Sequence, residues 1–223
     1  MSDIYIFQTK GLWYHHKLDQ RPDGMKFTSH THEIMEIYCL LSGAVRFYVE
    51  GRAYPLLPND VLIMRPAETH ALVFDDAEPY ERITFHFSPA YFQRYFPESR
   101  QLLEPFYQRD LGARNRFPSD KFPSGLLRGC MEGVSAHAKD SGHEELYVRS
   151  ALLPILAEIS LAFRSQDQKS AAVREDSLTG RIIRYINNHL FEPISVSSVS
   201  TSFHLSPSQL NRTFRAATGS TVW

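Results

Sequence analysis

HTHEIMEIYCLLSGAVRFYVEGRAYPLLPNDVLIMRPAETHALVF, residues 30–74, is the stretch that decides the fold of the N-terminal part of this chain. Runs of β-branched and aromatic residues alternate in it with turn sequences such as Ser42-Gly43 and Pro58-Asn59-Asp60. The predicted strands are Ile34–Leu41, Val45–Val49, Val61–Met64 and His70–Phe74, followed by Arg82–Phe87. Short strands separated by turns are typical of an all-β barrel or sandwich. We therefore predict a small β-barrel over residues 1–90.

The pattern becomes helical after the last predicted strand, and we expect helices over residues 91–164. One apolar face recurs there at helical spacing, formed by Leu152, Leu156, Ile159 and Phe163. Such a face predicts a homodimer through the helical segment, with packing inside the same chain as the alternative. Residues 165–177 contain almost no large apolar side chain and are predicted to be a linker.

The C-terminal stretch, residues 178–223, carries start and stop signals for three short helices. A first apolar stripe consists of Leu178, Ile182, Ile186 and Leu190. Residues 196–202 are expected to form a second short helix. Ser206 then supplies an N-cap, Pro207 occupies the first helical position, and Gln209 completes a capping box. Gly219 stands where a C-terminal cap belongs. A third helix is therefore predicted from Pro207 onward.

This third helix has an apolar face with Leu210 and Phe214, and an opposite polar face that carries two arginines. Residues 196–202, the tight turn after them and the helix from Pro207 onward form a helix-turn-helix arrangement. In this arrangement the second of the two helices, here the one from Pro207 onward, lies in the major groove of DNA. The residues expected to contact DNA are Ser208, Gln209, Asn211 and Arg212 for the bases, and Arg215 for the phosphates. A solvated surface helix is the alternative on periodicity alone.

Composition and charge narrow the class of protein. The 223 residues are 43% hydrophobic and 22% charged, which is typical of a folded globular protein. The longest apolar stretch, residues 151–163, is too short for a hydrocarbon layer of roughly 30 Å, so no membrane partner is expected. The N-terminus lacks the apolar run of a secretory signal, and Cys39 and Cys130 are too few for a disulfide framework, which favours the cytoplasm.

The net charge of −1 averages over segments of opposite sign. Residues 178–223 hold four arginines against Glu192, so 4 − 1 = +3 there, and −4 remains for everything before. This asymmetry permits a nucleic-acid face at the C-terminus.

The run RIIRYINNHLFEPISVSSVSTSFHLSPSQLNRTFRAATGSTVW, residues 181–223, resembles the first helix-turn-helix unit of the AraC family of bacterial transcription regulators. The segment LSPSQLNRTFRAATG is especially similar, whereas Ser200 stands where the family usually has a small alanine. The resemblance implies two such units joined by a long helix, of which these residues contain only the first. We therefore expect the present chain alone to bind operator DNA weakly or not at all at physiological salt.

A second motif lies at the N-terminal side. His30, His32 and Glu36 form H-x-H-x3-E, six residues separate Glu36 from Gly43, and His70 follows the turn at Asn59-Asp60. This looks like a cupin, the small barrel that serves as the sensor domain of AraC-type regulators. His30, His32 and Glu36 share strand parity, so an extended backbone would point them to one side.

The candidate metal ligands are therefore His30, His32, Glu36 and His70, a set that suits Zn, Ni, Mn or Fe. A metal-free, hydrogen-bonded cluster at the pocket floor is the alternative, because sensing an organic ligand requires no metal. Tyr38 shares the parity of Glu36 and is a candidate pocket residue. Arg82 is a candidate clamp for an anionic or polyhydroxyl ligand. The remaining histidines, such as His15, His16, His137 and His143, lack ligand spacing and are expected at the surface.

Together these features predict an α+β, ligand-responsive transcription regulator rather than an enzyme. By resemblance, a small effector, for example a sugar, binds in the barrel of a homodimer and changes how the DNA-binding domains are presented. No cofactor is required for that function. Two alternatives stay open: a metal-dependent cupin enzyme such as a dioxygenase or isomerase, and a ligand-binding or dimerisation module without DNA contact.

Overall fold

The computed structural model describes residues 2–20, 29–75, 78–122, 125–139, 141–169 and 194–218, together with residues 178, 181, 182, 185, 186 and 189. The strands are β1 (Ser2–Thr9), β2 (Leu12–Asp19), β3 (Met35–Ser42), β4 (Val45–Val49), β5 (Arg52–Leu56), β6 (Val61–Met64), β7 (His70–Phe74), β8 (Tyr80–Phe87) and β9 (Arg116–Phe117). The helices are α1 (Pro89–Tyr95), η2 (Pro97–Leu103), α2 (Glu104–Tyr107), η3 (Ser119–Lys121), α3 (Leu126–His137), α4 (Glu144–Lys169), α6 (Val196–Ser202) and α7 (Pro207–Thr218).

The strands form two antiparallel sheets. The larger sheet has the order β1-β2-β8-β3-β6-β9 and the smaller one β5-β4-β7. The described strands therefore make a cupin-like two-layer sandwich, a form that the predicted alternative of an all-β barrel or sandwich included. β4, β6 and β7 match their predicted bounds, and β8 begins at Tyr80 rather than Arg82. The larger sheet also gains β9, which pairs with β6 and lies beyond the predicted end of the barrel at residue 90.

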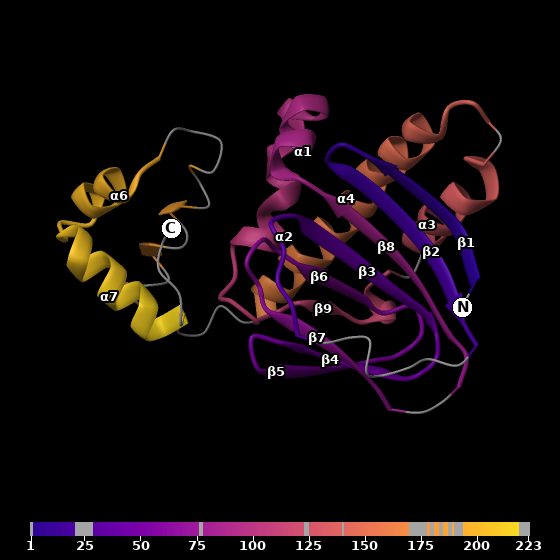
Figure 1. The fold of residues 1–223 in the computed structure, drawn as a ribbon, viewed down its shortest axis with the longest axis horizontal. Helices are drawn as coiled ribbons and strands as arrows, with labels where there is room; N and C mark the ends of the chain where they lie inside the picture. Colours follow the sequence, from indigo (N-terminus) through magenta and orange to yellow (C-terminus); the bar gives the residue numbers. More distant parts are fainter. Residues whose placement is uncertain are drawn as a thin grey trace.

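The larger sheet is buried on both faces, and the alternation along its strands decides what each face contacts. On β3, Met35, Ile37 and Cys39 lie in the core shared with the helices. Tyr38 and Leu40 lie in a second core shared with β4 and β7. Successive side chains of a strand point to opposite faces, so each strand serves both cores. Figure 1 shows α4 running behind the larger sheet, with β4, β5 and β7 in a separate layer.

The turn before β6 depends on the residue type at its sharpest point. Asn59 precedes β6 with φ of 70°, in the left-handed region that favours glycine and that asparagine tolerates better than most residues. Its backbone N–H donates to the carbonyl of Leu40 at 2.6 Å, which ties the turn to β3.

The apolar face of α4 packs inside the chain, and this finding corrects the predicted dimer face. Leu152, Leu156, Ile159 and Phe163 are all buried in the core against the larger sheet. They are therefore not available to a second copy. The homodimer itself stays a prediction. Leu146 and Leu161 are 52% and 63% exposed, so these residues of α4 are the ones that a second copy could contact.

The helix α4 is longer than the sequence indicated. It runs to Lys169, so the described residues 165–169 of the predicted linker are helical, and residues 170–177 lie outside the described part of the chain. Residues Glu144–Ser165 are long and apolar enough, by length and composition, to cross a membrane. This stretch is longer than residues 151–163, the longest apolar stretch found by sequence analysis. Its buried face packs in the core in the manner of a core helix of a globular domain.

The C-terminal helices form a small core of their own. Ile182, Val199 and Leu210 are fully buried there, and Phe203 and Phe214 pack against them. The predicted capping box of α7 is confirmed, because the N–H of Gln209 donates to Ser206 Oγ at 3.2 Å and the N–H of Ser206 donates to Gln209 Oε1 at 3.0 Å. The predicted stripe residue Leu190 and the predicted cap Gly219 lie outside the described residues.

We expect Leu156→Ala to lower the free energy of unfolding by about 2–5 kcal/mol, because it removes methylene groups from a packed core and leaves a cavity. Urea unfolding followed by circular dichroism measures the loss. Leu161→Ala on the same helix is the matched control, and it should change the free energy by about 0.5 kcal/mol or less because Leu161 is exposed. Equal effects of the two substitutions would contradict the assignment of the buried face.

Candidate ligand pocket and metal-binding cluster

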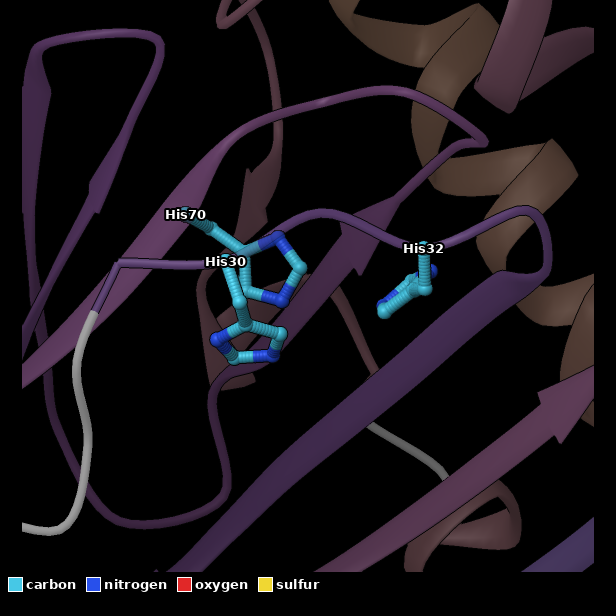
Figure 2. A group of neighbouring side chains, drawn as sticks. All are labelled: His30, His32 and His70. Atoms are coloured by element: carbon cyan, nitrogen blue, oxygen red, sulfur yellow. The ribbon is translucent and has the colours of Figure 1, made fainter.

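Strand pairing brings together side chains that are far apart in the sequence. Glu36 on β3 lies directly opposite His86 on β8. His30 forms an isolated bridge with His70, and each backbone N–H of this pair donates to the other residue's carbonyl, at 3.0 and 2.9 Å. Figure 2 shows His30 and His32 on the segment that leads into β3 and His70 at the start of β7. Four segments thus converge on one end of the sandwich.

The four predicted metal-ligand candidates lie in this cluster. The rings of His30 and His70 are 4.3 Å apart between centroids, and those of His32 and His70 are 5.0 Å apart. His32 Nε2 lies 3.0 Å from Glu36 Oε2, and His70 Nε2 lies 3.5 Å from the same oxygen. One ring nitrogen from each of His30, His32 and His70 falls within 4.8 Å of the others.

His86 is a fifth member that the sequence did not indicate. Its Nε2 lies 3.2 Å from Glu36 Oε2, and His32, Glu36 and His86 form a second group with the same 4.8 Å spacing. His86 stands outside the H-x-H-x3-E motif, so motif spacing gave no signal for it. Its position opposite Glu36 depends on the pairing register of β3 and β8, which only the tertiary structure fixes.

Glu36 is the charged centre of the cluster. Burial acts to raise its pKa, but the charge of His86 and the hydrogen bonds from His32, His70 and His86 outweigh burial and hold the pKa of Glu36 well below its usual value. A buried carboxylate in this state is ionised at neutral pH and needs partners around it. The imidazoles supply those partners.

The orientation of His70 is set by a backbone carbonyl. Its Nδ1 lies 2.9 Å from the carbonyl oxygen of Glu68, and because a carbonyl only accepts, Nδ1 carries the proton of this hydrogen bond. Nε2 is buried and forms no hydrogen bond of good geometry with a described residue; its contact with Glu36 Oε2 is long, at 3.5 Å. Burial acts to lower the pKa of His70, but Glu36 and the Glu68 carbonyl outweigh it and leave that pKa above its usual value. A proton and a metal ion would therefore compete for Nε2.

The carboxylate of Glu68 anchors the turn that carries His70. Arg109 Nη2 donates to Glu68 Oε2 at 2.6 Å, and both side chains are fully buried. The N–H of Gly112 donates to Oε1 at 2.9 Å, and Asn115 Nδ2 donates to Oε2 at 3.2 Å. Gly112 has φ of 64°, and a Cβ there would lie 2.7 Å from the Val49 carbonyl. This network fastens the turn between β6 and β7 to residues 109–115.

A cavity of about 200 Å³ lies between the two sheets beside the histidine cluster. Both predicted pocket residues, Tyr38 and Arg82, line it. The other lining residues are Trp13, His30, Glu36, Phe47, His70, Leu72, Tyr80, Thr84 and His86. Tyr38 and Tyr80 bond to one another through their hydroxyls at 2.8 Å. The cavity therefore has a polar end at the cluster and mostly apolar walls.

The remaining histidines divide into two groups. His137 and His143 are exposed, as predicted. The surface prediction is wrong for His15 and His16, which are 8% and 7% exposed. His16 bridges layers, because its Nδ1 lies 2.7 Å from Ser135 Oγ on α3 and its Nε2 lies 2.8 Å from Glu81 Oε1 on β8.

The predicted DNA-contacting residues all lie on α7. Ser208, Gln209, Arg212 and Arg215 are exposed, and Asn211 is half-buried. Gln209 already serves the cap of the helix through Ser206, so its side-chain oxygen has a partner within the chain. The four other residues carry no such capping role.

The sequence profile of the family described as the AraC-like ligand binding domain matches residues 13–178. The chain belongs to the family of AraC-like ligand-binding domains. The matched region of this AraC-like domain contains the smaller sheet, the larger sheet from β2 onward and helices α1 to α4, and hence the cavity and the whole histidine cluster.

Individual relatives are distant. The chain is similar to the uncharacterized HTH-type transcriptional regulator YfiF of Bacillus subtilis strain 168, with 24% identity over 198 residues, 85% of this chain and 60% of that protein. It thus spans less than two thirds of that relative. Among solved structures it is similar to the AraC-like transcriptional activator CuxR, with 14% identity, a TM-score of 0.49, and coverage of 94% of this chain and 72% of that one. A cupin protein from Bacteroides fragilis has 21% identity, a TM-score of 0.32, and coverage of 35% and 67% respectively.

We expect Arg109→Met to lower the free energy of unfolding by about 3–5 kcal/mol, because it leaves the buried Glu68 carboxylate without its cation. Urea unfolding at pH 7 measures the loss. The double variant Glu68→Gln/Arg109→Met should recover part of it, because the buried carboxylate is then removed together with its cation. The recovery is only partial because the buried Arg65 also loses the attraction of Glu68. If Arg109→Met unfolded at the same urea concentration as the unmodified protein, the anchoring role of the pair would be wrong.

The ion pair also predicts a pH dependence. Burial acts to raise the pKa of Glu68, but Arg109 outweighs it and the pKa lies below its usual value. A carboxyl whose pKa is lower in the folded state stabilises the fold above its unfolded pKa of about 4.3, and this stability is lost as the pH falls toward the folded pKa. The difference in stability between unmodified protein and the double variant should therefore shrink below about pH 4.

Proposed function

We propose that this chain is the sensor part, with the first DNA-binding unit, of a ligand-responsive transcription regulator. The observation that carries the proposal is the cavity beside the histidine cluster, inside a domain that belongs to the AraC-like ligand-binding family. A small effector in this cavity would contact both sheets, since Tyr38 and Arg82 lie on the larger sheet and Phe47 and Leu72 on the smaller. An effector that binds one arrangement of the domain more tightly shifts the population toward it.

The pair α6 and α7 supports a DNA-binding role for the C-terminal part. Four residues, 203–206, separate the two helices, and Leu210 and Phe214 of α7 face the small core. Arg212 and Arg215 are exposed on the same helix. This leaves a cationic, polar surface on the helix that would enter the major groove.

We expect Arg212→Ala, in a protein that carries both DNA-binding units, to cost roughly 1–3 kcal/mol on an operator selected from random-sequence DNA, with little change on random DNA. Arg215→Ala should weaken binding to both DNAs and reduce the salt dependence, because a phosphate contact carries no sequence information. Fluorescence anisotropy at several salt concentrations separates the two effects.

Residues 1–223 alone should bind the selected operator weakly or not at all at physiological salt, because one unit neutralises few phosphates. Tight binding by this chain would contradict the need for two units. If Arg212→Ala lowered the affinity equally for operator and random DNA, Arg212 would not be one of the residues that contact the bases.

We further propose that the cluster binds a transition metal. His30, His32 and His70 would hold the ion, with Glu36 or His86 completing the set. The residues fit such a group, because the buried Nε2 of His70 makes only a long contact, 3.5 Å, with Glu36 Oε2, and its Nδ1 is held by a carbonyl. A bound Zn, Ni, Mn or Fe ion would supply a Lewis-acid position for an oxygen atom of the effector.

Protein purified without chelator should therefore retain a transition metal at up to one equivalent, measured by elemental analysis. His70→Ala should reduce the content at least tenfold, and His143→Ala, an exposed histidine outside the cluster, should retain it. Absence of metal in the purified protein, together with no uptake of added Zn, Ni, Mn or Fe, would leave a hydrogen-bonded cluster instead.

The same cluster favours one other function, a metal-dependent cupin enzyme. The five polar side chains at one end of a cavity would suit such chemistry, whereas the pair α6 and α7 would have no part in it. Selection of a specific operator by the two-unit protein favours the regulator. Chemical conversion of a cavity ligand by metal-loaded protein would favour the enzyme.

A further inference from the structure

Arg82 places a positive charge in the cavity and forms no ion pair with a described residue. The Asp3 carboxylate attracts this charge but is hydrogen-bonded to His15, whose Nε2 lies 2.7 Å from Asp3 Oδ1. Arg82 lies on β8 between Tyr80 and Thr84, and all three residues line the cavity. Arg82 Nη1 donates to Thr84 Oγ1 at 3.2 Å, and its other hydrogen-bond partner is the Tyr80 hydroxyl. Both partners are neutral. No carboxylate lies within ion-pair distance of Arg82 in the described part of the chain.

Three other arginines of the domain differ in this respect. Arg109 pairs with Glu68, Arg116 Nη2 lies 2.7 Å from Asp60 Oδ2, and Arg46 Nη2 lies 3.0 Å from Asp75 Oδ1. A half-buried guanidinium has five N–H donors and is poorly stabilised by neutral acceptors alone. Arg82 is therefore the cation of this cavity that a bound anion would complete.

The acidic groups of the cavity do not fill this role. Glu36 also lines the cavity, but its Oε2 is shared by three histidines. The Tyr38 and Tyr80 hydroxyls bond to one another, and burial raises the pKa of Tyr80 to about 12, so this phenol stays neutral. Arg82 therefore keeps its charge in the cavity without an ion pair to a described residue.

The rest of the lining limits the body of the ligand. Trp13, Phe47 and Leu72 give the walls an apolar character, and the volume of about 200 Å³ admits only a small molecule. A sugar would need several polar partners, whereas the hydroxyls of Tyr38, Tyr80 and Thr84 already have partners. A planar guanidinium matches a carboxylate with two parallel hydrogen bonds.

We propose that the effector is a small organic carboxylate with an apolar body, held by an ion pair between its carboxylate and Arg82. This inference rests on the proposed sensor function and specifies the chemical class that the sensor recognises. It replaces the sugar suggested by resemblance alone.

The test uses pairs of molecules of equal shape that differ in charge. Acetate and acetamide, butyrate and butyramide, and benzoate and benzamide are each titrated into the full chain by calorimetry at fixed ionic strength. We expect the acid to bind at least tenfold more tightly than the amide in at least one pair, the size expected for a hydrogen-bonded charge.

Variants assign the preference to Arg82. Arg82→Gln should lower the affinity for the preferred acid at least tenfold and change the affinity for its amide less than twofold. Arg82→Lys should keep part of the preference, because it retains the charge but not the planar fork. Arg52→Gln is the matched control, since Arg52 is exposed on β5 of the smaller sheet and should leave both affinities unchanged.

Two results would overturn the carboxylate, and both differ from a failure of the sensor function. Amides or glucose binding as tightly as every acid would show a neutral ligand, with the sensor function intact. Unchanged acid affinity in Arg82→Gln would place the anion elsewhere. The sensor function itself would fail if no small molecule altered operator binding by the two-unit protein.

Discussion

The buried ion pair between Glu68 and Arg109 connects the parts of this domain on which its site depends. Glu68 lies on the turn between β6 and β7, two residues before His70, and its carbonyl orients the His70 ring. Arg109 lies after α2, outside the strands of the sandwich, and also donates to the Pro105 carbonyl. Because a buried charge is stable only with its partner in place, the histidine cluster and the segment around Arg109 must form together.

That segment continues to the helix that leads out of the domain. Arg114 Nη2 donates to the Phe163 carbonyl at 2.8 Å, and Arg114 Cζ lies 3.7 Å from the centre of the Phe163 ring. A continuous set of contacts thus runs from His70 through Glu68 and Arg109 to α4. Such a set provides a physical connection between the cavity and α4, and coupling along it requires that the two ends favour the same arrangement.

The larger sheet places the site between two cores. Its outer face packs against the helices, and the face toward β4, β5 and β7 holds the polar residues that line the cavity. The smaller sheet contributes only three strands, which leaves room between the layers for a small ligand. One face of the larger sheet therefore belongs to the core that stabilises the domain, and the other face lines the cavity.

The sequence alone determined the local features of this protein. The strands β4, β6 and β7, the capping box at Ser206 and Gln209, and the shared side of His30, His32 and Glu36 all follow from spacing within a few residues. The strands β1, β2, β5 and β9 gave weaker local signals and were missed. The family resemblance, also read from local motifs, is confirmed for the ligand-binding domain.

The tertiary structure decided everything that depends on which distant segments meet. It placed His86 opposite Glu36, buried the α4 stripe that periodicity alone left open to a partner, and brought Arg109 to Glu68. It also left Arg82 without an ion pair to a described residue, hydrogen-bonded to Thr84 instead. Periodicity shows that a face will be covered but not by what, because pairing register and packing are set by contacts between residues far apart in the chain.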